Sequence, residues 1–235
     1  MEDRILGPLR AHFASIEQRI ASGEARLGYK VAFNIAAAQR QLGIDHSLIA
    51  GLTERTLLRE EKPIVDVSAM TRPLLEAEVA VRLRATVRPD ATADEVIDAI
   101  DGIAPAIELI DLDLPMDRLE EILSAGVFHR AVAFGRFSPP PRGAALAGLG
   151  VRVTSSGEPV FEGDAERATG GLVDLLPRLA GLAECADQRL LAGDRIILGS
   201  MAPPHPARPG RAFALEIAGY GRVELGFRSS APAPS

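Results

Sequence analysis

Apolar residues recur along this chain with two different periods, and each period predicts a different kind of element. A spacing of three and four residues after Gly7 and Pro8 predicts a short amphipathic helix over 9–22. Thr92 and Glu95 have the spacing of a capping box, which predicts a helix whose apolar stripe is Val96, Ile97, Ile100 and Ile103. A leucine-rich stretch over 170–185 predicts another helix, which Pro177 kinks or delays. A helical turn over 36–44 ends at Gly43.

Extended segments outnumber these helices. The apolar runs predict a strand around Glu108, a hairpin of 150–154 with 159–163, and further strands over 27–34, 64–70, 76–87, 128–137, 195–201, 211–219 and 221–227. Residues 111–123 are expected to connect two strands. The pattern therefore predicts an α+β fold, a mixed and largely antiparallel sheet structure with a few packed helices.

Composition narrows the class of protein. The 235 residues, 47% of them hydrophobic, are enough for one sizeable core. A net charge of −6 without any basic run argues against a nucleic-acid partner. Cys185 is the only cysteine, which excludes an intramolecular disulfide and a cysteine zinc site and fits a reducing cytoplasm. The acidic amino terminus and the lack of an 18-residue apolar run predict a cytoplasmic protein with no membrane partner.

Three glutamates are the main candidates for chemistry. Glu76 and Glu78 stand two residues apart in an extended segment, so both point to one face, roughly 6 to 7 Å apart along the backbone. Adjacent carboxylates repel unless they are protonated or bridged by a cation. Glu108 lies in an apolar run, where a charged group is seldom buried unless paired or bound to metal. The set is compatible with a site for a hard divalent cation, and also with an ordinary solvated strand face.

Other polar residues allow both a functional and a plain interpretation. Lys30 among apolar neighbours could be a snorkelling surface lysine, a contact for an anionic substrate, or a proton-transfer group once burial lowers its pKa. His129 and Arg130 at a strand start could help to hold an anion, or His129 could be a satisfied core residue. Ser200 follows Gly199 without a nucleophile elbow around it, and no nucleotide-binding glycine motif is present.

An ordered set of sequence blocks indicates which protein family the chain resembles. These blocks are GYKVAFN with Lys30, AQRQLGID ending at Asp45, EAE with Glu76 and Glu78, PAIELID with Glu108 and Asp111, and AGDRIILGS with Gly193, Asp194 and Gly199. In order and spacing, from about Gly28 to Phe227, the chain resembles the fumarylacetoacetate hydrolase superfamily, in its branch of 2-oxopent-4-enoate hydratases and 4-oxalocrotonate decarboxylases.

The resemblance implies a rolled β structure with flanking helices, usually a homo-oligomer. It divides the chain into a short helical segment at 1–27, a catalytic domain at 28–228 and a disordered tail at 229–235. It implies Mg²⁺ or Mn²⁺ on Glu76, Glu78 and Glu108, and a small 2-oxo acid substrate beside Lys30, which would be catalytic. Further substrate contacts are expected at His129, Arg130, Gly199 and Ser200.

The chain departs from that branch at positions where its members carry polar groups. Leu48, Ala125 with Gly126, and Leu198 stand where the hydratases usually have an acid, an Asp-Asn pair and a threonine. Such groups could orient water, so the departures bear on the reaction more than on metal binding. The leading expectation is a hydratase-like lyase of aromatic catabolism. The alternatives are a 2-oxo diacid decarboxylase, a fumarylpyruvate-type C–C hydrolase, and a non-catalytic protein that binds metal and a 2-oxo acid.

Overall fold

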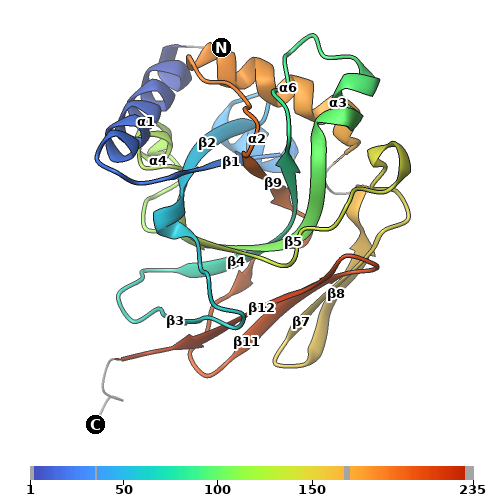
Figure 1. Ribbon diagram of the computed structural model, residues 1–235. Helices are drawn as coiled ribbons and strands as arrows, with labels where there is room; N and C mark the ends of the chain where they lie inside the picture. The colour runs from blue at the N-terminus through green and yellow to red at the C-terminus, as the bar shows by residue number, and fades with distance from the viewer. Residues whose placement is uncertain (1–2, 35, 167–169, 231–235) are drawn as a thin grey trace.

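Two β-sheets and the helices around them make up the protein, which is described here from a computed structural model covering residues 3–34, 36–166 and 170–230 (Figure 1). The helices are α1 (Asp3–Ala21), α2 (Ala36–Leu42), α3 (Ala93–Ala99), α4 (Leu119–Ser124) and α6 (Leu172–Cys185), with short 3-10 helices η1 (Glu54–Thr56) and η2 (Arg142–Ala144). The mixed α+β class expected from the sequence is confirmed.

The larger sheet is mostly antiparallel and has the order β2-β1-β9-β4-β5-β6, with β10 paired to β4. Among the described strand pairs of this sheet, β1 with β9 is parallel and the others are antiparallel. Its strands are β1 (Arg26–Ala32), β2 (Leu48–Thr53), β4 (Pro73–Leu83), β5 (Ile100–Asp111), β6 (His129–Phe134), β9 (Arg195–Ser200) and β10 (His205–Pro206).

The smaller sheet has the order β3-β12-β11-β7-β8. Its strands are β3 (Ile64–Asp66), β7 (Gly150–Ser155), β8 (Glu158–Asp164), β11 (Ala212–Ile217) and β12 (Gly221–Arg228). Strands β11 and β12 pack against β5, so this sheet covers one side of the larger one, whereas α1 and α6 lie over β2 on another side (Figure 1).

The larger sheet curls until its two ends nearly meet. Leu57, just after η1, forms a bridge with Val132 of β6, and the Leu58 N–H donates to the Val132 carbonyl at 2.9 Å. A small apolar cluster lies on one face of the curl: Leu27, Leu52, Ala80, Ala106, Val132 and Ile197. Ala80 and Ala106 continue the even-numbered positions of β4 and β5, which also carry the three glutamates. The alternation of side chains therefore places the three glutamates on the same face of the sheet as this apolar cluster.

Several boundaries differ from those predicted. Helix α1 begins at Asp3, with Pro8 inside it, because Ile5 is 1% exposed and extends the buried stripe towards the amino terminus. Helix α3 ends at Ala99, so the predicted helical positions Ile100 and Ile103 belong to β5 instead. Their burial suits a strand covered on both faces as well as it suits a helix.

Other elements were extended, shortened or missed. Strand β4 starts at Pro73, at the end of a strand where a missing N–H is tolerated, and stops at Leu83 rather than at residue 87. The predicted connection at 111–123 contains the start of α4. Strands β2 and β10 were not predicted, whereas the hairpin of β7 and β8 is confirmed.

The predicted division of the chain stays a prediction, with two observations beside it. Ile5, Leu9 and Phe13 of α1 lie in the same core cluster as the strands of the larger sheet. Of the predicted disordered tail at 229–235, residues 231–235 lie outside the described part, and the Ser230 N–H donates to Asp66 at 3.4 Å.

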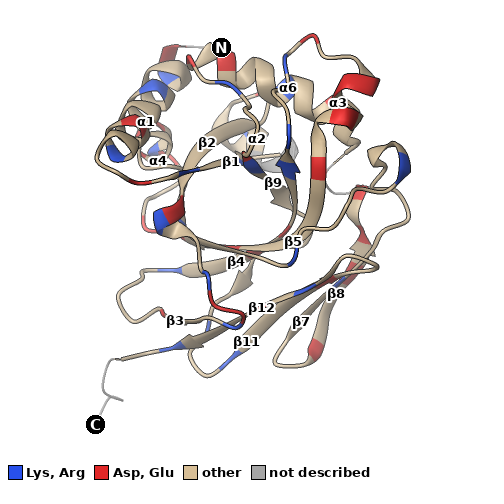
Figure 2. Cartoon of the chain, in the orientation of Figure 1, with Lys and Arg blue, Asp and Glu red and all other residues tan. Residues whose placement is uncertain are grey.

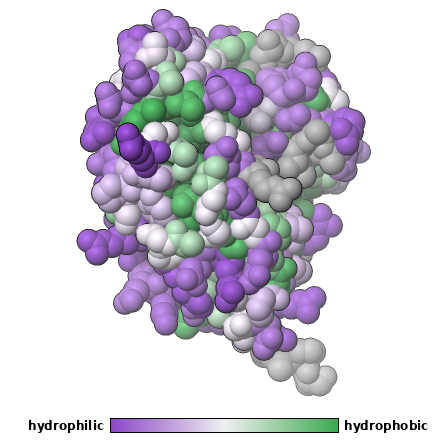
Figure 3. Space-filling model, turned by 90° about the vertical axis from the view of Figure 1, so that its right-hand side faces the viewer, coloured by the Kyte–Doolittle hydropathy of each residue, from purple (hydrophilic) through white to green (hydrophobic). Residues whose placement is uncertain are grey.

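Charged residues lie mainly on the helices, loops and outer strands, as Figure 2 shows, for example the acidic residues of α3. The face at the right of Figure 1 is largely hydrophilic, interrupted by hydrophobic patches (Figure 3). Within the described residues, no helix combines the length and apolar character that crossing a membrane requires.

Candidate metal and substrate site

The pairing of β4 with β5 brings the three glutamates together. Glu76 and Glu108 are directly opposite each other on β4 and β5, and Glu78 follows Glu76 on the same face. One carboxylate oxygen from each of the three lies within 4.8 Å of the others. Glu78 and Glu108 are 0% exposed, and Glu76 faces a cavity. These three glutamates are called the carboxylate cluster below.

In each of the two fully buried glutamates, one carboxylate oxygen accepts a hydrogen bond and the other has no partner among the described residues. Glu78 Oε2 accepts from the Gly199 N–H at 2.6 Å, and Glu108 Oε1 accepts from Lys30 Nζ at 2.5 Å. Among the described residues, Glu78 Oε1 and Glu108 Oε2 are buried and have no hydrogen-bond partner. Buried polar atoms are almost always partnered, and carboxylate oxygens are the ligands that hard divalent cations prefer. The donor set therefore fits such a cation.

The pKa shifts of the carboxylate cluster also fit a bound cation. Burial and the neighbouring Glu108 raise the pKa of Glu76 to about 7, and the same two causes raise the pKa of Glu78 well above its usual value. Although burial opposes it, the charges of Lys30 and His129 lower the pKa of Glu108. One ammonium group thus faces three carboxylates, and the excess negative charge is what a bound cation would neutralise.

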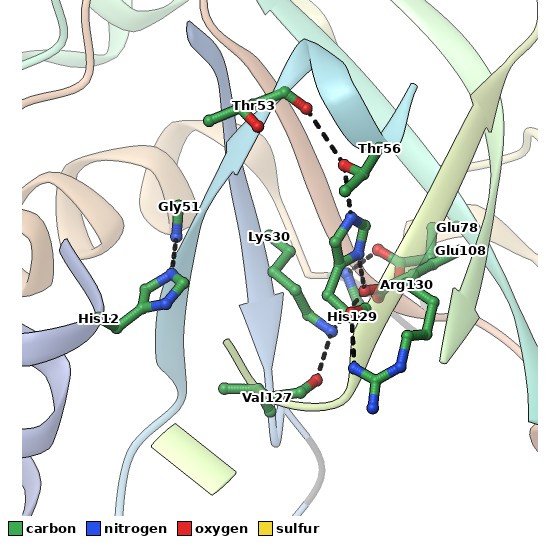
Figure 4. A network of polar contacts seen from close by, with 11 residues as sticks. His12, Lys30, Gly51, Thr53, Thr56, Glu78, Glu108, Val127, His129 and Arg130 are labelled. Carbon is green, nitrogen blue, oxygen red and sulfur yellow. Dashed lines mark hydrogen bonds and ion pairs between the residues drawn. The ribbon is translucent and has the colours of Figure 1, made fainter. Parts of the chain in front are cut away.

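Lys30 projects from β1 with 2% of its surface exposed. Its ammonium group donates to Glu108 and to the Val127 carbonyl at 3.0 Å, and it also lines the cavity (Figure 4). The backbone at Val127 and Phe128 is left-handed, with φ of 55° and 63°, which is unusual for such residues at the point where this carbonyl meets Lys30.

The protonation of Lys30 bears on the roles considered from the sequence. Burial lowers the pKa of Lys30, but the charges of Glu108 and Glu76 outweigh burial, so its pKa is raised overall. The lowered pKa on which the proton-transfer hypothesis depends is therefore not found. An ammonium group has three N–H bonds, so one remains to meet a substrate anion after those to Glu108 and Val127.

His129 and Arg130 stand at the start of β6, His129 with a buried ring and Arg130 with a partly exposed guanidinium group. His129 lies between Glu108 and Thr56, and Arg130 donates to the His129 carbonyl at 3.0 Å and pairs with Asp113 at 2.5 Å. Neither is among the described residues that line the cavity. Substrate contact by these two residues stays a prediction.

The cavity next to the carboxylate cluster has a volume of about 590 Å³. Its wall is mostly apolar and includes Leu74, Ile110, Leu112, Met116, Met201 and Pro203. Gly199 and Ser200 also line it, and the Ser200 hydroxyl donates to the Ala202 carbonyl at 2.6 Å. Lys30 and Glu76 are the charged residues of the described wall. A ligand here would meet two charged side chains and a largely apolar wall.

The positions that depart from the family pattern lie outside the described cavity wall. Leu48 and Leu198 are fully buried in the main core. Gly126 faces the His12 ring, and a Cβ there would lie 2.9 Å from His12 Cε1. The His12 ring in turn accepts the Gly51 N–H at 2.9 Å (Figure 4).

Three contributors to the site were not found from the sequence. Val127 contributes a backbone carbonyl, which no side-chain pattern reveals. Thr56 contacts His129 from η1, and Asn34 packs against Gly199, where a Cβ would lie 2.4 Å from Asn34 Nδ2. Both depend on the curl of the sheet, which brings distant segments together.

The chain is similar in sequence to enzymes of known activity. No profile of a known protein family matches the chain. The 2-keto-4-pentenoate hydratase of Paraburkholderia xenovorans is 27% identical over 221 residues, which cover 91% of this chain and 80% of the relative. The 4-oxalocrotonate decarboxylase of a Pseudomonas species is 25% identical over 213 residues, 89% of this chain and 82% of the relative.

A solved structure shares the fold. The 4-oxalocrotonate decarboxylase of Pseudomonas putida, complexed with magnesium and adipate, superposes with a TM-score of 0.82 and 24% identity over 92% of this chain and 83% of that one. The chain is similar in sequence to a hydratase and a decarboxylase, and it shares the fold of the solved decarboxylase. The resemblance to the fumarylacetoacetate hydrolase superfamily inferred from the sequence blocks is confirmed, as is its rolled β fold.

Proposed function

We propose that this protein is a divalent-metal-dependent lyase that acts on a small 2-oxo or 2-hydroxydienoic acid, as a 2-oxopent-4-enoate hydratase does. The observation that carries the proposal is the carboxylate cluster, whose two unpartnered buried oxygens lie beside the Lys30 ammonium group and a cavity of about 590 Å³. The similarity to a 2-keto-4-pentenoate hydratase supports the same reaction class.

The metal would be held by Glu76, Glu78 and Glu108, and Mg²⁺ or Mn²⁺ is the proposed ion. When bound, a divalent cation supplies a Lewis acid that stabilises negative charge on the 2-oxygen of the substrate. The solved structure of the 4-oxalocrotonate decarboxylase contains magnesium, which supports a divalent ion in this fold.

The residues of the chain would bind and orient the substrate. Lys30 has an N–H left to donate to the substrate carboxylate, while its bonds to Glu108 and Val127 fix the position of the ammonium group. Leu112 and Met116 would pack against the substrate tail and keep water away from it. Lys30 therefore acts mainly as an anion contact in this proposal.

The second candidate is decarboxylation of a 2-oxo diacid, which the similarity to the 4-oxalocrotonate decarboxylase favours. A diacid would bring a second carboxylate to the far end of the cavity. Lys30 is the basic residue of the described wall, which otherwise consists mostly of apolar residues such as Leu112 and Met116. An unpaired carboxylate there would be desolvated without compensation, so the cavity favours a monoacid with an apolar tail.

The wider setting is also part of the proposal. A place in the breakdown of aromatic compounds is proposed from the family resemblance, and the relatives include a 2-hydroxyhexa-2,4-dienoate hydratase. Cys185 is a free, exposed thiol, which suits a reducing cytoplasm. A homo-oligomer is proposed from the family resemblance and is tested by light scattering of the purified protein.

The test combines metal binding with product analysis. Calorimetry with MgCl₂ and MnCl₂ is expected to give binding that Glu108→Ala removes; absence of binding, or binding that Glu108→Ala leaves unchanged, would refute the metal site. Loss of the dienol ultraviolet band without CO₂ release indicates hydration, CO₂ release indicates decarboxylation, and a pyruvate fragment indicates C–C hydrolysis. Turnover that Glu76→Ala abolishes would exclude a non-catalytic binding protein.

A further inference from the structure

A chain of hydrogen bonds leads from the carboxylate cluster to the backbone behind it (Figure 4). Glu108 Oε1 lies 2.6 Å from His129 Nδ1, and His129 Nε2 lies 2.8 Å from the Thr56 hydroxyl. The same hydroxyl lies 3.1 Å from the Thr53 carbonyl. The chain therefore starts at a proposed metal ligand and ends at the junction between β2 and η1.

The chemistry of the acceptors fixes where the imidazole proton lies. An ionised carboxylate only accepts, so the His129 nitrogen next to Glu108 must carry the hydrogen. The opposite tautomer would direct a lone pair at the Glu108 carboxylate. The Thr56 hydroxyl lies 2.8 Å from Nε2 and also donates to the Thr53 carbonyl, so it is held on both sides and in turn holds the outer edge of the ring.

The orientation of this ring decides which oxygen of Glu108 is left for a metal. His129 and Lys30 both bind Oε1, and Oε2 is the oxygen without a described hydrogen-bond partner. The His129 side chain is 9% exposed, so it is held within the protein. If the ring turned or changed tautomer, Oε1 would lose one of its two partners and the carboxylate could rotate.

We propose that Thr56 is a positioning residue of the metal site: its hydroxyl fixes the orientation of the His129 ring, which holds Oε1 of Glu108 and so presents Oε2 to a divalent cation. The inference rests on the proposed function, since it assumes that a cation binds the carboxylate cluster. Hydrogen-bond partners behind a ligand typically change metal affinity 10- to 100-fold when they are removed.

Thr56→Val removes the hydroxyl and keeps the shape of the side chain, and Thr56→Ser restores the hydroxyl. Thr154→Val, at a buried threonine on β7 of the smaller sheet, is the matched control. In calorimetry with MnCl₂, Thr56→Val is expected to bind roughly 10- to 100-fold more weakly, with Thr56→Ser and Thr154→Val close to the unchanged protein. Thr56→Ala gives the same comparison if the valine variant does not fold.

A spectroscopic measurement separates positioning from packing. Imidazole ¹⁵N shifts of His129 in the metal-free protein are expected to show the hydrogen bond of Nε2 in the unchanged protein and in Thr56→Ser, and its loss in Thr56→Val. Equal Mn²⁺ affinities for Thr56→Val and the unchanged protein would overturn the inference, as would a loss that serine does not restore. If the unchanged protein itself binds no Mn²⁺ or Mg²⁺, it is the proposed function that fails.

Discussion

The pH dependence of folding should carry a measurable contribution from His12. This residue lies on α1 and is 6% exposed, and its Nε2 accepts the Gly51 N–H from β2 at 2.9 Å. Burial lowers its pKa from 6.5 to about 4. The perturbation is a fall in pH from 7 to 5.5, compared between the unchanged protein and His12→Gln, whose amide oxygen can accept from Gly51 but does not titrate.

The sign and size follow from proton linkage. The folded pKa of His12 lies below the unfolded value, so the unfolded chain binds more protons between the two pKa values and stability falls as the pH falls. The full shift of about 2.5 units corresponds to about 3.4 kcal/mol of unfolding free energy, lost on going from above pH 6.5 to below pH 4. Between pH 7 and 5.5 the expected loss is about 1.2 kcal/mol.

Urea unfolding at the two pH values, followed by circular dichroism in the presence of a chelator, measures this loss. Other groups titrate over the same range, so the decisive quantity is the difference between the two proteins. The unchanged protein should lose about 1.2 kcal/mol more than His12→Gln. Equal losses would show that His12 is protonated in the folded state or already neutral in the unfolded one, and the argument from burial would be refuted.

Three further outcomes are expected. Mn²⁺ should raise the melting temperature of the chelator-treated protein, and a Glu78→Gln variant should lose most of this rise; an equal rise in both would contradict the role of Glu78. Lys30→Met leaves the buried Glu108 without its ammonium partner and should lower the unfolding free energy by about 3 kcal/mol in urea titrations; a loss below about 1 kcal/mol would refute this. Gly199→Ala places a Cβ 2.4 Å from Asn34 at a backbone φ of 93°, and it should lower the unfolding free energy by about 1–3 kcal/mol in urea titrations. Gly219→Ala, at a φ of 79° but with no heavy atom within 4 Å of the new Cβ, should lower it by less.

Local patterns predicted the parts of the site that lie on single strands. The alternation in β4 placed Glu76 and Glu78 on one face, and the apolar run around Glu108 indicated a buried strand, as found. The same reasoning failed at Ile100 and Ile103, because a strand buried on both faces has no alternation to distinguish it from a buried helix. It left the role of Lys30 open, since the direction of a pKa shift depends on neighbours from other strands.

Contacts between distant segments could not be predicted from spacing. The Val127 carbonyl, Thr56 and Asn34 reach the site only because the larger sheet curls and brings η1 against β6. The sequence blocks that carried the family resemblance include acids with a structural role. Asp194 pairs with Arg26 at 2.7 Å and Asp111 accepts the Thr71 N–H at 3.0 Å, so part of that similarity reflects the fold rather than the chemistry.

The charged and the apolar residues of the cavity wall come from different parts of the chain. Lys30 and Glu76 lie within strands β1 and β4 of the curled sheet, where moving one residue would disturb the paired strands beside it. The apolar residues include Leu112 and Met116 from the segment before α4, and Met201 and Pro203 from the segment after β9. Substitutions in these two segments can reshape the space for a substrate tail while the charged residues stay in place. The architecture therefore allows a lineage to change its substrate without rebuilding its reactive centre, and it marks these segments as the natural targets for directed evolution.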